Sequence, residues 1–249
     1  MTDIVQRWQA LLQDTLTTAL AERRAALETA AGLLADRLLA GRSFFAFGCN
    51  HSHLLVDEIF YRAGSLVPVN PIEVPGLRLD TASPLTGSDL EKLPDLARRV
   101  LDHTPLGAGD VLLVVSTSGR NTVPVEMAEQ GRRRGAAVVA LTSVAYAESE
   151  PSLAPSGRKL HQVADVILDS GAPAGDAALA VPGVPAAMGP VSTIVGAALL
   201  HAWMARTAEM LAARGMEPPV FRSANQPGGS AWNRAALDRL GAQIHWPRD

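Results

Sequence analysis

Short apolar runs alternate along this chain with segments whose apolar residues recur every three or four positions. The clearest run is Asp110–Val115 (DVLLVV), a continuous aliphatic stretch typical of a strand that is buried on both faces. Four other runs predict strands at Ser43–Phe47, Ser65–Val69, Ala136–Leu141 and Ala164–Leu168. Strands that alternate with helices predict a parallel sheet covered by helices on both faces.

Helical periodicity covers the first forty residues, and Gly41 can end that helix because glycine tolerates the left-handed cap position. Ser88 and Glu91 form a capping-box pattern before a further helix. The segment Ser170–Pro190 is dense in Gly, Pro and Ala and predicts a loop. The other predicted helices are Ser52–Arg62, Asp89–Asp102, Val123–Arg134 and Val191–Arg214.

The chain shows no internal repeat and no low-complexity linker, so we expect one domain over residues 1–249. It would consist of an N-terminal helix (1–41), a sheet core (43–214) and a loop-rich tail (215–249) with room for one short helix. Extensions of this kind often pack on a second subunit, which predicts a homodimer or a higher homo-oligomer.

Composition excludes several classes of protein. The 249 residues carry a net charge of −3 and one cysteine, Cys49, which excludes an intrachain disulfide and a cysteine-rich zinc site. The slight acidity argues against nucleic acid as a partner. Lys92 and Lys159 are the only lysines, so Schiff-base chemistry is nearly excluded.

The longest apolar stretch, near residues 194–204, is too short to span a membrane, and the first ten residues lack a signal core. We therefore expect a cytoplasmic protein.

Two polar loops follow the first and third predicted strands. In open parallel sheets a ligand binds beyond the carboxyl ends of the strands, where the strand order reverses. For the common order 2-1-3-4-5, this point lies between strands one and three. The loops that meet there are Gly48-Cys49-Asn50-His51-Ser52-His53 and Ser116-Thr117-Ser118-Gly119-Arg120-Asn121-Thr122.

The second loop has the composition of an anion site. It offers four hydroxyls, a glycine that lets the backbone approach a ligand, and the start of a helix, where free N–H groups and the helix dipole favour phosphate. These residues could instead simply cap the helix. A similar loop after the first strand favours phosphate binding. Neither loop contains a dinucleotide or P-loop fingerprint or a lysine, so we expect a small phosphorylated metabolite and no cofactor.

The blocks around these loops resemble the sugar isomerase (SIS) domain family, in particular its small single-domain proteins. Similarity in the same order extends over nearly the whole chain. The similar blocks are Phe44–Gly64, Gly109–Ala128, Pro155–Asp169, Gly189–Ala198 and Glu217–Asn225. The resemblance implies a five-stranded, parallel, flavodoxin-like sheet and a sugar phosphate as ligand.

The resemblance also implies which residues form the site. The Ser/Thr loop after the third strand would hold the phosphate, and Ser52 would lie near the sugar. The chain departs from this pattern at Cys49-Asn50, where a glycine-rich turn is expected. It departs again after Gly228-Gly229, where Ser230-Ala231-Trp232-Asn233 replaces an Asp-Glu-His run. The predicted phosphate- and sugar-binding residues are Gly48, Asn50, His51, Ser52, Ser116, Thr117, Ser118, Gly119, Asn121 and Thr122.

Isomerisation of a sugar phosphate needs a base and a second proton-transfer group, and the shortage of lysine leaves glutamate and histidine. Glu58 lies six residues after Ser52, although it could simply pair with Arg62 on the next turn. His53 is a candidate acid–base or hydroxyl-binding group. His201 fits a packed core or interface position, but a histidine on this helix serves catalysis in some relatives. His51 and His53 lack a third ligand at a helpful spacing, so no metal site is expected.

Three functions remain open on the sequence alone. The first is a sugar-phosphate isomerase or related lyase that acts through an enediol or an elimination. The second is a sensor that binds a sugar phosphate without converting it. The third, a nucleotide-dependent α/β enzyme, is disfavoured by the missing fingerprints.

Overall fold

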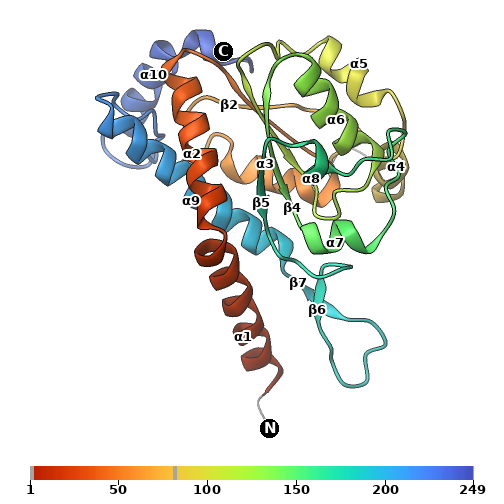
Figure 1. The fold of residues 1–249 in the computed structure, drawn as a ribbon. Coiled ribbons are helices and arrows are strands. Elements are labelled where there is room, and N and C mark those ends of the chain that lie inside the picture. The colour runs from red at the N-terminus through yellow and green to blue at the C-terminus, as the bar shows by residue number, and fades with distance from the viewer. Residues whose placement is uncertain (1–2, 81–82, 249) are drawn as a thin grey trace.

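A five-stranded sheet forms the centre of the molecule. The computed structural model describes residues 3–80 and 83–248. All five strands are parallel, and their order, β2-β1-β3-β4-β5, is the predicted 2-1-3-4-5. Helices cover both faces, which confirms the flavodoxin-like α/β fold (Figure 1). The strands are β1 (Phe44–Gly48), β2 (Val69–Pro71), β3 (Val111–Val115), β4 (Ala137–Thr142) and β5 (Val166–Asp169).

Alternate residues of the strands enter two hydrophobic cores, one on each side of the sheet. In β3, Leu112 and Val114 pack with helices α5, α6 and α8, and the other three residues pack with α2, α3 and α9. Because both faces are covered, the strand is aliphatic at every position. These helices are α2 (Arg24–Leu39), α3 (Leu54–Ile59), α5 (Leu96–Asp102), α6 (Thr122–Arg133), α8 (Leu160–Val163) and α9 (Ser192–Ala213).

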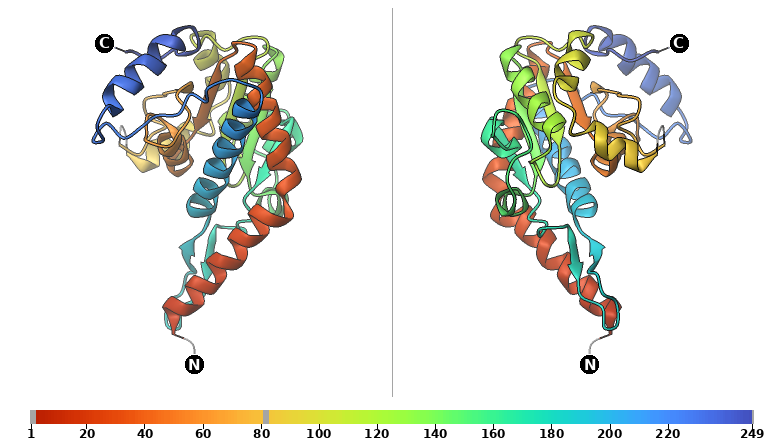
Figure 2. Two further views of the ribbon diagram at one scale, coloured as in Figure 1. Left: turned by 90° about the vertical axis from the view of Figure 1, so that its left-hand side faces the viewer. Right: turned by 90° about the vertical axis from the view of Figure 1, so that its right-hand side faces the viewer.

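The N-terminal region forms an arm that projects from the body. The predicted single helix is interrupted by a π-turn at Thr18–Glu22, which separates α1 (Ile4–Thr17) from α2. The segment predicted as a loop at 170–190 contains an antiparallel hairpin, β6 (Ala177–Leu179) and β7 (Met188–Pro190). Figure 2 shows α1 and this hairpin side by side, pointing away from the sheet. The predicted helix 1–41 and tail 215–249 extend onto residues 1, 2 and 249, which lie outside the described residues.

The predicted strand Ser65–Val69 is wrong in its position. Strand β2 begins only at Val69, immediately after Pro68, which has no N–H group to donate to a ladder. Before it, Leu66 forms a single bridge to Val220, and the Val67 N–H donates to the carbonyl of Pro219. The apolar run therefore packs against the C-terminal segment rather than extending the sheet.

The helix predicted over Asp89–Asp102 is wrong, because two helices occupy this region. Helix α4 (Pro84–Leu90) ends where that helix was expected to begin, and α5 starts after Asp95, which adopts a left-handed conformation with φ of 65°. Ser88 and Glu91 therefore form no capping box, since Glu91 lies at the C-terminal end of α4. This position frees the Glu91 side chain for other contacts.

The C-terminal segment covers the outer edge of strand β2. After α10 (Gly229–Arg239) the chain runs along this edge, where the buried Asn70 amide donates to the Gln243 carbonyl at 2.8 Å. The Asn70 side-chain oxygen accepts the His245 N–H at 2.7 Å, and the Trp246 indole donates to the Val69 carbonyl at 3.1 Å. These bonds occupy polar groups that an edge strand would otherwise expose.

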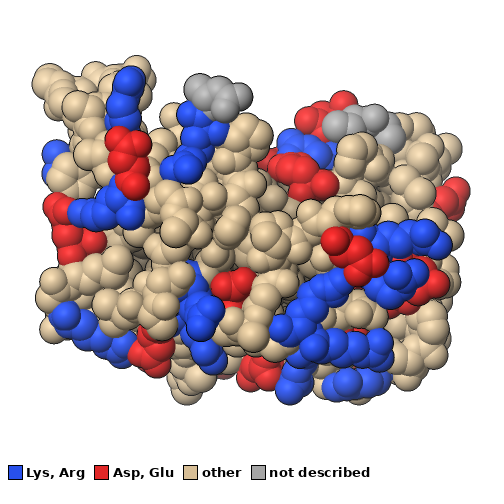
Figure 3. All heavy atoms as spheres, turned by 90° about the horizontal axis from the view of Figure 1, so that it is seen from above, with Lys and Arg blue, Asp and Glu red and all other residues tan. Residues whose placement is uncertain are grey.

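Charges of both signs share the surface. Seen from above in Figure 3, basic and acidic side chains lie interspersed, with one larger group of basic side chains at the lower right. Many of them pair, such as Arg98 with Asp102 at 3.1 Å. Within residues 3–80 and 83–248, no helix is long and apolar enough to cross a membrane.

Candidate functional site

A cavity of about 570 Å³ opens at the carboxyl ends of β1 and β3, where the strand order reverses. This is the position predicted for the site, because ligands of open α/β sheets bind at such a point. Both predicted loops contribute to its walls, together with α4 and two residues before β6. It is lined by Cys49, Asn50, His51, Ser52, Leu79, Pro84, Ser88, Glu91, Ser116, Thr117, Ser118, Asn121, Tyr146, Gly175 and Asp176.

A smaller cavity of about 210 Å³ continues from the first one toward the start of α9. It shares His51, Ser52, Thr117 and Asp176 with the larger cavity. The remaining residues of its lining come from α3, the end of β7 and the first turn of α9. They are Leu55, Pro190, Ser192 and Thr193.

The loop after β1 turns tightly because Gly48 has no side chain. A Cβ atom at Gly48 would lie 2.7 Å from the carbonyl oxygen of Ser52 and 2.9 Å from the nitrogen of His53. Asn50 adopts a left-handed conformation with φ of 51°, and its N–H donates to the carbonyl of Leu77 at 2.7 Å. The turn thus presents Asn50, His51 and Ser52 to the cavity, whereas the predicted binding residue Gly48 is not part of the lining.

The loop after β3 presents hydroxyl groups. Ser116 accepts the Gly119 N–H through its Oγ at 3.2 Å, which leaves its own hydroxyl proton free to donate. Gly119 has φ of 57°, and a Cβ there would lie 2.7 Å from the hydroxyl oxygen of Thr142. Thr122 is buried and donates to the carbonyl of Leu153 at 3.0 Å. Of the residues predicted in this loop, Ser116, Thr117, Ser118 and Asn121 line the cavity, whereas Gly119 and Thr122 shape the loop.

Glu91 joins the two loops. Its two carboxylate oxygens accept hydrogen bonds from the side-chain amides of Asn50, at 3.1 Å, and of Asn121, at 2.5 Å. Its backbone carbonyl accepts the Val123 N–H at 2.9 Å, in the first turn of α6. Burial raises the pKa of the Glu91 carboxyl above its ordinary value. Sequence reasoning missed this residue, because it interpreted Glu91 as part of a capping box.

Asp176 is a second cavity residue that sequence reasoning missed. Its carboxylate accepts the N–H groups of Val191 and Ser192, at 3.1 and 2.9 Å, and the Ser192 hydroxyl at 2.6 Å. An acidic side chain at the start of a helix is favourable, because it satisfies free N–H groups and complements the helix dipole. The separation of 16 residues between Asp176 and Ser192, the first residue of α9, hid this contact in the sequence.

His53 does not face the cavity; it is almost fully buried, at 3% exposure. Its Nδ1 lies 3.2 Å from the Gly48 carbonyl, which can only accept, and its Nε2 lies 2.9 Å from a nitrogen of Arg78, which can only donate. The hydrogen-bond partners thus assign the proton to Nδ1. Both ring nitrogens thus have partners within the protein, and His53 is absent from the lining of both cavities; its acid–base role stays a prediction.

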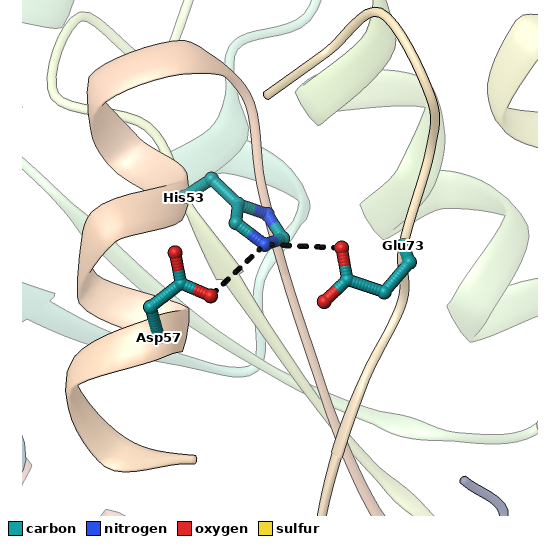
Figure 4. A group of neighbouring side chains, drawn as sticks. All are labelled: His53, Asp57 and Glu73. Atoms are coloured by element: carbon teal, nitrogen blue, oxygen red, sulfur yellow. Dashed lines mark ion pairs between the residues drawn. The ribbon is translucent and has the colours of Figure 1, made fainter. Parts of the chain in front are cut away.

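Arg78 lies at the centre of an acidic cluster around His53. The carboxylates of Asp57 and Glu73 lie 3.5 and 3.4 Å from His53 Nε2 (Figure 4). These three side chains could hold a metal ion by their spacing. A guanidinium nitrogen of Arg78 lies 2.6 Å from Glu73 and 3.3 Å from Asp57, so the arginine supplies the positive charge that the carboxylates need.

This cluster predicts a pH-dependent contribution to stability. The Arg78 guanidinium, 2.6 Å from a carboxylate oxygen of Glu73, holds the pKa of Glu73 below its usual range. A carboxyl whose pKa is lowered by folding stabilises the protein above the pKa of the unfolded chain, and this contribution is lost as the pH falls through the folded-state pKa. Wild type should therefore be more stable than Glu73→Gln at pH 7. The difference in the free energy of unfolding between wild type and Glu73→Gln should decrease as the pH falls from about 5 to about 3, around the usual glutamate pKa.

Urea denaturation of wild type and Glu73→Gln across this pH range measures the difference in the free energy of unfolding. Glu150→Gln, at an exposed glutamate outside the cluster, is the control and should run parallel to wild type at every pH. A gap between wild type and Glu73→Gln that stayed constant down to pH 3 would contradict the assignment.

Glu58 and His201 contact each other. His201 Nε2 lies 2.8 Å from a carboxylate oxygen of Glu58. Glu58 also pairs with Arg62, the alternative that the sequence analysis left open. Gly196 permits this approach of α3 to α9, because a Cβ there would lie 2.6 Å from Leu55. Both side chains are partly exposed, at 34% and 41%, and neither belongs to the lining of the two cavities. The structure thus brings two predicted acid–base residues into contact: Glu58, one turn after Leu55 on α3, and His201 on α9.

Cys49 lies in the wall of the cavity but is buried. Burial raises the pKa of its thiol well above the ordinary value, and the charge of Glu91 acts in the same direction. A thiol of this kind is a poor nucleophile, because the thiolate is the reactive form. The structure favours a packing role for Cys49.

Comparison with known proteins identifies the family. The model of the SIS domain matches residues 7–143, so the chain belongs to the SIS-domain family. Within it, the chain belongs to the UPF0309 proteins. It is 44% identical to UPF0309 protein SCO4393 of Streptomyces coelicolor over 236 residues, which cover 94% of each chain. It is 37% identical to UPF0309 protein GK1441 of Geobacillus kaustophilus over 241 residues, which cover 97% of this chain and 96% of the relative.

Solved structures share the fold. A phosphoheptose isomerase from Francisella tularensis superposes with a TM-score of 0.55 at 15% identity, covering 84% of this chain and 100% of that one. The phosphoheptose isomerase GmhA from Neisseria gonorrhoeae gives a TM-score of 0.53 at 17% identity, covering 82% of this chain and 97% of that one. At this level of identity the likeness establishes the architecture.

Proposed function

We propose that this protein is a cytoplasmic sugar-phosphate isomerase or a related lyase that needs no cofactor. The observation that carries the proposal is the hydroxyl-lined cavity at the point where the strand order reverses. The phosphate lies on the hydroxyls of Ser116, Thr117 and Ser118, and the sugar extends toward His51 and Ser52. The phosphoheptose isomerases with the same fold support this choice of ligand.

Glu58 and His201 are proposed to supply the proton transfers. An aldose–ketose isomerase removes a proton from C2 of the aldose and returns it to C1 through an enediol, while a second group moves a proton between the two oxygens. A carboxylate hydrogen-bonded to an imidazole provides both functions, and Glu58 lies 2.8 Å from His201. The related lyase would use the same base for an elimination.

A non-catalytic sugar-phosphate sensor is the second candidate. One observation favours it, since the Glu58–His201 pair lies outside the lining of both cavities. The two candidates share the phosphate site and differ only in conversion of the ligand.

A thermal-shift screen of hexose and heptose phosphates tests the shared part, because a ligand that binds the folded state raises the melting temperature. We expect sugar phosphates to stabilise the protein and nucleotides to have no effect. For any sugar phosphate that binds, exchange in deuterated water of the C2 proton of an aldose, or of a C1 proton of a ketose, distinguishes the isomerase from the sensor. Stabilisation by nucleotides alone would contradict both candidates.

Ser118→Ala should weaken binding of the sugar phosphate about tenfold, because one hydrogen bond to a charged group contributes about 1.5 kcal/mol or more. Isothermal titration calorimetry measures the change. Ser152→Ala is a suitable control, since Ser152 is a loop serine outside the cavity whose hydroxyl donates to the carbonyl of Arg158. Unchanged affinity in Ser118→Ala would remove this loop from the site.

We further propose that two or more copies of the chain assemble through the projecting arm. Trp8 of α1 contacts Gly189 of the hairpin, and apolar side chains remain exposed beside them, including Val5 at 69% and Met188 at 52%. Exposed apolar groups of this kind favour burial against a partner. Light scattering should report a multiple of the 26.2 kDa chain mass, and a monomer would contradict the proposal.

A further inference from the structure

The Glu91 carboxylate is held by one asparagine side chain from each of the two predicted loops. Asn50 comes from the loop after β1 and Asn121 from the loop after β3, and each donates one amide N–H to one oxygen of Glu91. The carboxylate thus bridges the two loops that line the cavity. Its position is fixed by three segments far apart in sequence.

The Asn50 amide is itself held in one orientation. A Cβ at Gly87 would lie 2.2 Å from the Asn50 side-chain oxygen, so helix α4 packs directly against this amide. Turning the amide over would place its oxygen against the carboxylate of Glu91, where two acceptors would repel each other. The Glu91 carboxylate therefore favours the orientation of Asn50 with its NH₂ group toward Glu91, and the Asn50 oxygen lies against α4 without a hydrogen-bond partner among the described residues.

The carboxylate retains the capacity to bind a ligand. Two oxygens offer about four acceptor positions, and the two asparagines use one on each oxygen. Glu91 belongs to the lining of the larger cavity, beside Ser116 and Ser118. Hydroxyl groups are the ligand groups that such an acceptor can bind.

Charge decides which end of the ligand lies at Glu91. A negative carboxylate repels a phosphate dianion, because like charges at short distance are unfavourable. The hydroxyls of Ser116 and Ser118 can donate to phosphate without this repulsion. The phosphate must therefore lie on the serine side, and the hydroxylated part of the ligand must lie on the Glu91 side.

We propose that Glu91 is the specificity-determining residue of this cavity, which accepts hydrogen bonds from sugar hydroxyls and selects polyhydroxylated phosphates over inorganic phosphate. This inference rests on the proposed function, since it assigns the sugar end of the same site. Asn50 and Asn121 act as positioning residues that hold the carboxylate toward the cavity.

The test compares Glu91→Gln with wild type using three probes: glucose 6-phosphate, fructose 6-phosphate and inorganic phosphate. Glutamine keeps the shape of the side chain but replaces one acceptor oxygen by a donor. The affinity for whichever sugar phosphate wild type binds should fall at least tenfold, whereas the stabilisation by inorganic phosphate should stay unchanged or increase. Calorimetry measures the first and thermal shift the second.

Glu126→Gln is the matched control. Burial also raises the pKa of Glu126, whose carboxylate accepts the Asp95 N–H at 3.0 Å, but this residue lies outside the cavity lining. It should bind all three probes as wild type does. An equal loss for sugar phosphate and inorganic phosphate in Glu91→Gln would show a structural role and overturn the inference, as would unchanged affinity.

The same experiment separates this inference from the proposed function. If wild type binds none of the hexose and heptose phosphates of the thermal-shift screen, the proposed function fails together with the inference. If wild type binds a sugar phosphate and Glu91→Gln binds it equally well, only the inference fails.

Discussion

Gly48→Ala should abolish high-affinity binding and lower the stability of the protein. The added Cβ would lie within 2.9 Å of backbone atoms of Ser52 and His53, so the loop after β1 must shift. Overpacking of this kind costs about 1–3 kcal/mol of unfolding free energy. The shift displaces Asn50, His51 and Ser52 together, and loss of about 1 kcal/mol for each contact weakens binding more than about a hundredfold.

Gly32→Ala provides a matched control with the same chemical change. Gly32 lies inside α2, and a Cβ there meets nothing within 4 Å. Alanine should raise stability by about 0.5–1 kcal/mol, because glycine loses more conformational freedom in a helix, and binding should not change. Calorimetry and chemical denaturation measure both effects. Gly48→Ala with wild-type affinity would show that the loop after β1 takes no part in binding.

Glu58→Gln should reduce turnover by about a hundredfold to ten thousandfold, the usual contribution of general acid–base catalysis. Glutamine keeps the hydrogen-bonding length of the side chain but cannot accept a proton from carbon. Binding of the sugar phosphate should stay within about twofold of wild type, because the phosphate site is untouched. The rate of C2 proton exchange in deuterated water measures turnover.

Two further variants sharpen this result. His201→Gln should have a similar effect, and the double variant should be little worse than either single one, because groups that act as a unit are not additive. Glu209→Gln is the control, since Glu209 also pairs with an arginine, Arg206, but on an exposed part of α9. Full turnover in Glu58→Gln would exclude the proposed base. Absence of exchange in wild type that binds sugar phosphate would favour the sensor.

The sequence was sufficient to predict the order and direction of the strands and the position of the cavity, although β2 begins at Val69 and not at Ser65. The aliphatic run of β3 reflects burial on both faces, and the two hydroxyl-rich loops follow the strands that flank the point where the order reverses. These features depend on local composition and on general rules of α/β topology. Seven of the predicted binding residues therefore line the cavity: Asn50, His51, Ser52, Ser116, Thr117, Ser118 and Asn121.

The contacts within the site could not be predicted, because they join residues that are distant in sequence. Glu91 meets Asn50 and Asn121 across separations of 41 and 30 residues. His53 was predicted as a catalytic group from its place beside Ser52, and nothing in the sequence indicated its contact with Arg78, 25 residues away. Side-chain chemistry alone gives no sign of either partner. The roles of Glu58 and His201 remain predictions.

The bonds along the edge of β2 have a consequence for synthesis of the chain. The buried Asn70 side chain reaches its full set of partners only when residues 243–245 are in place, and Trp246 completes the edge. On the ribosome, N-terminal parts of a chain emerge and begin to fold first. A nascent chain that already holds β1, β3 and β4 can pair the Asn70 amide with the Phe44 carbonyl, but it still lacks the partners from Gln243 and His245. Residues 243–246 therefore complete the sheet edge only after the rest of the sheet has formed, so chains that lack these residues should fold poorly.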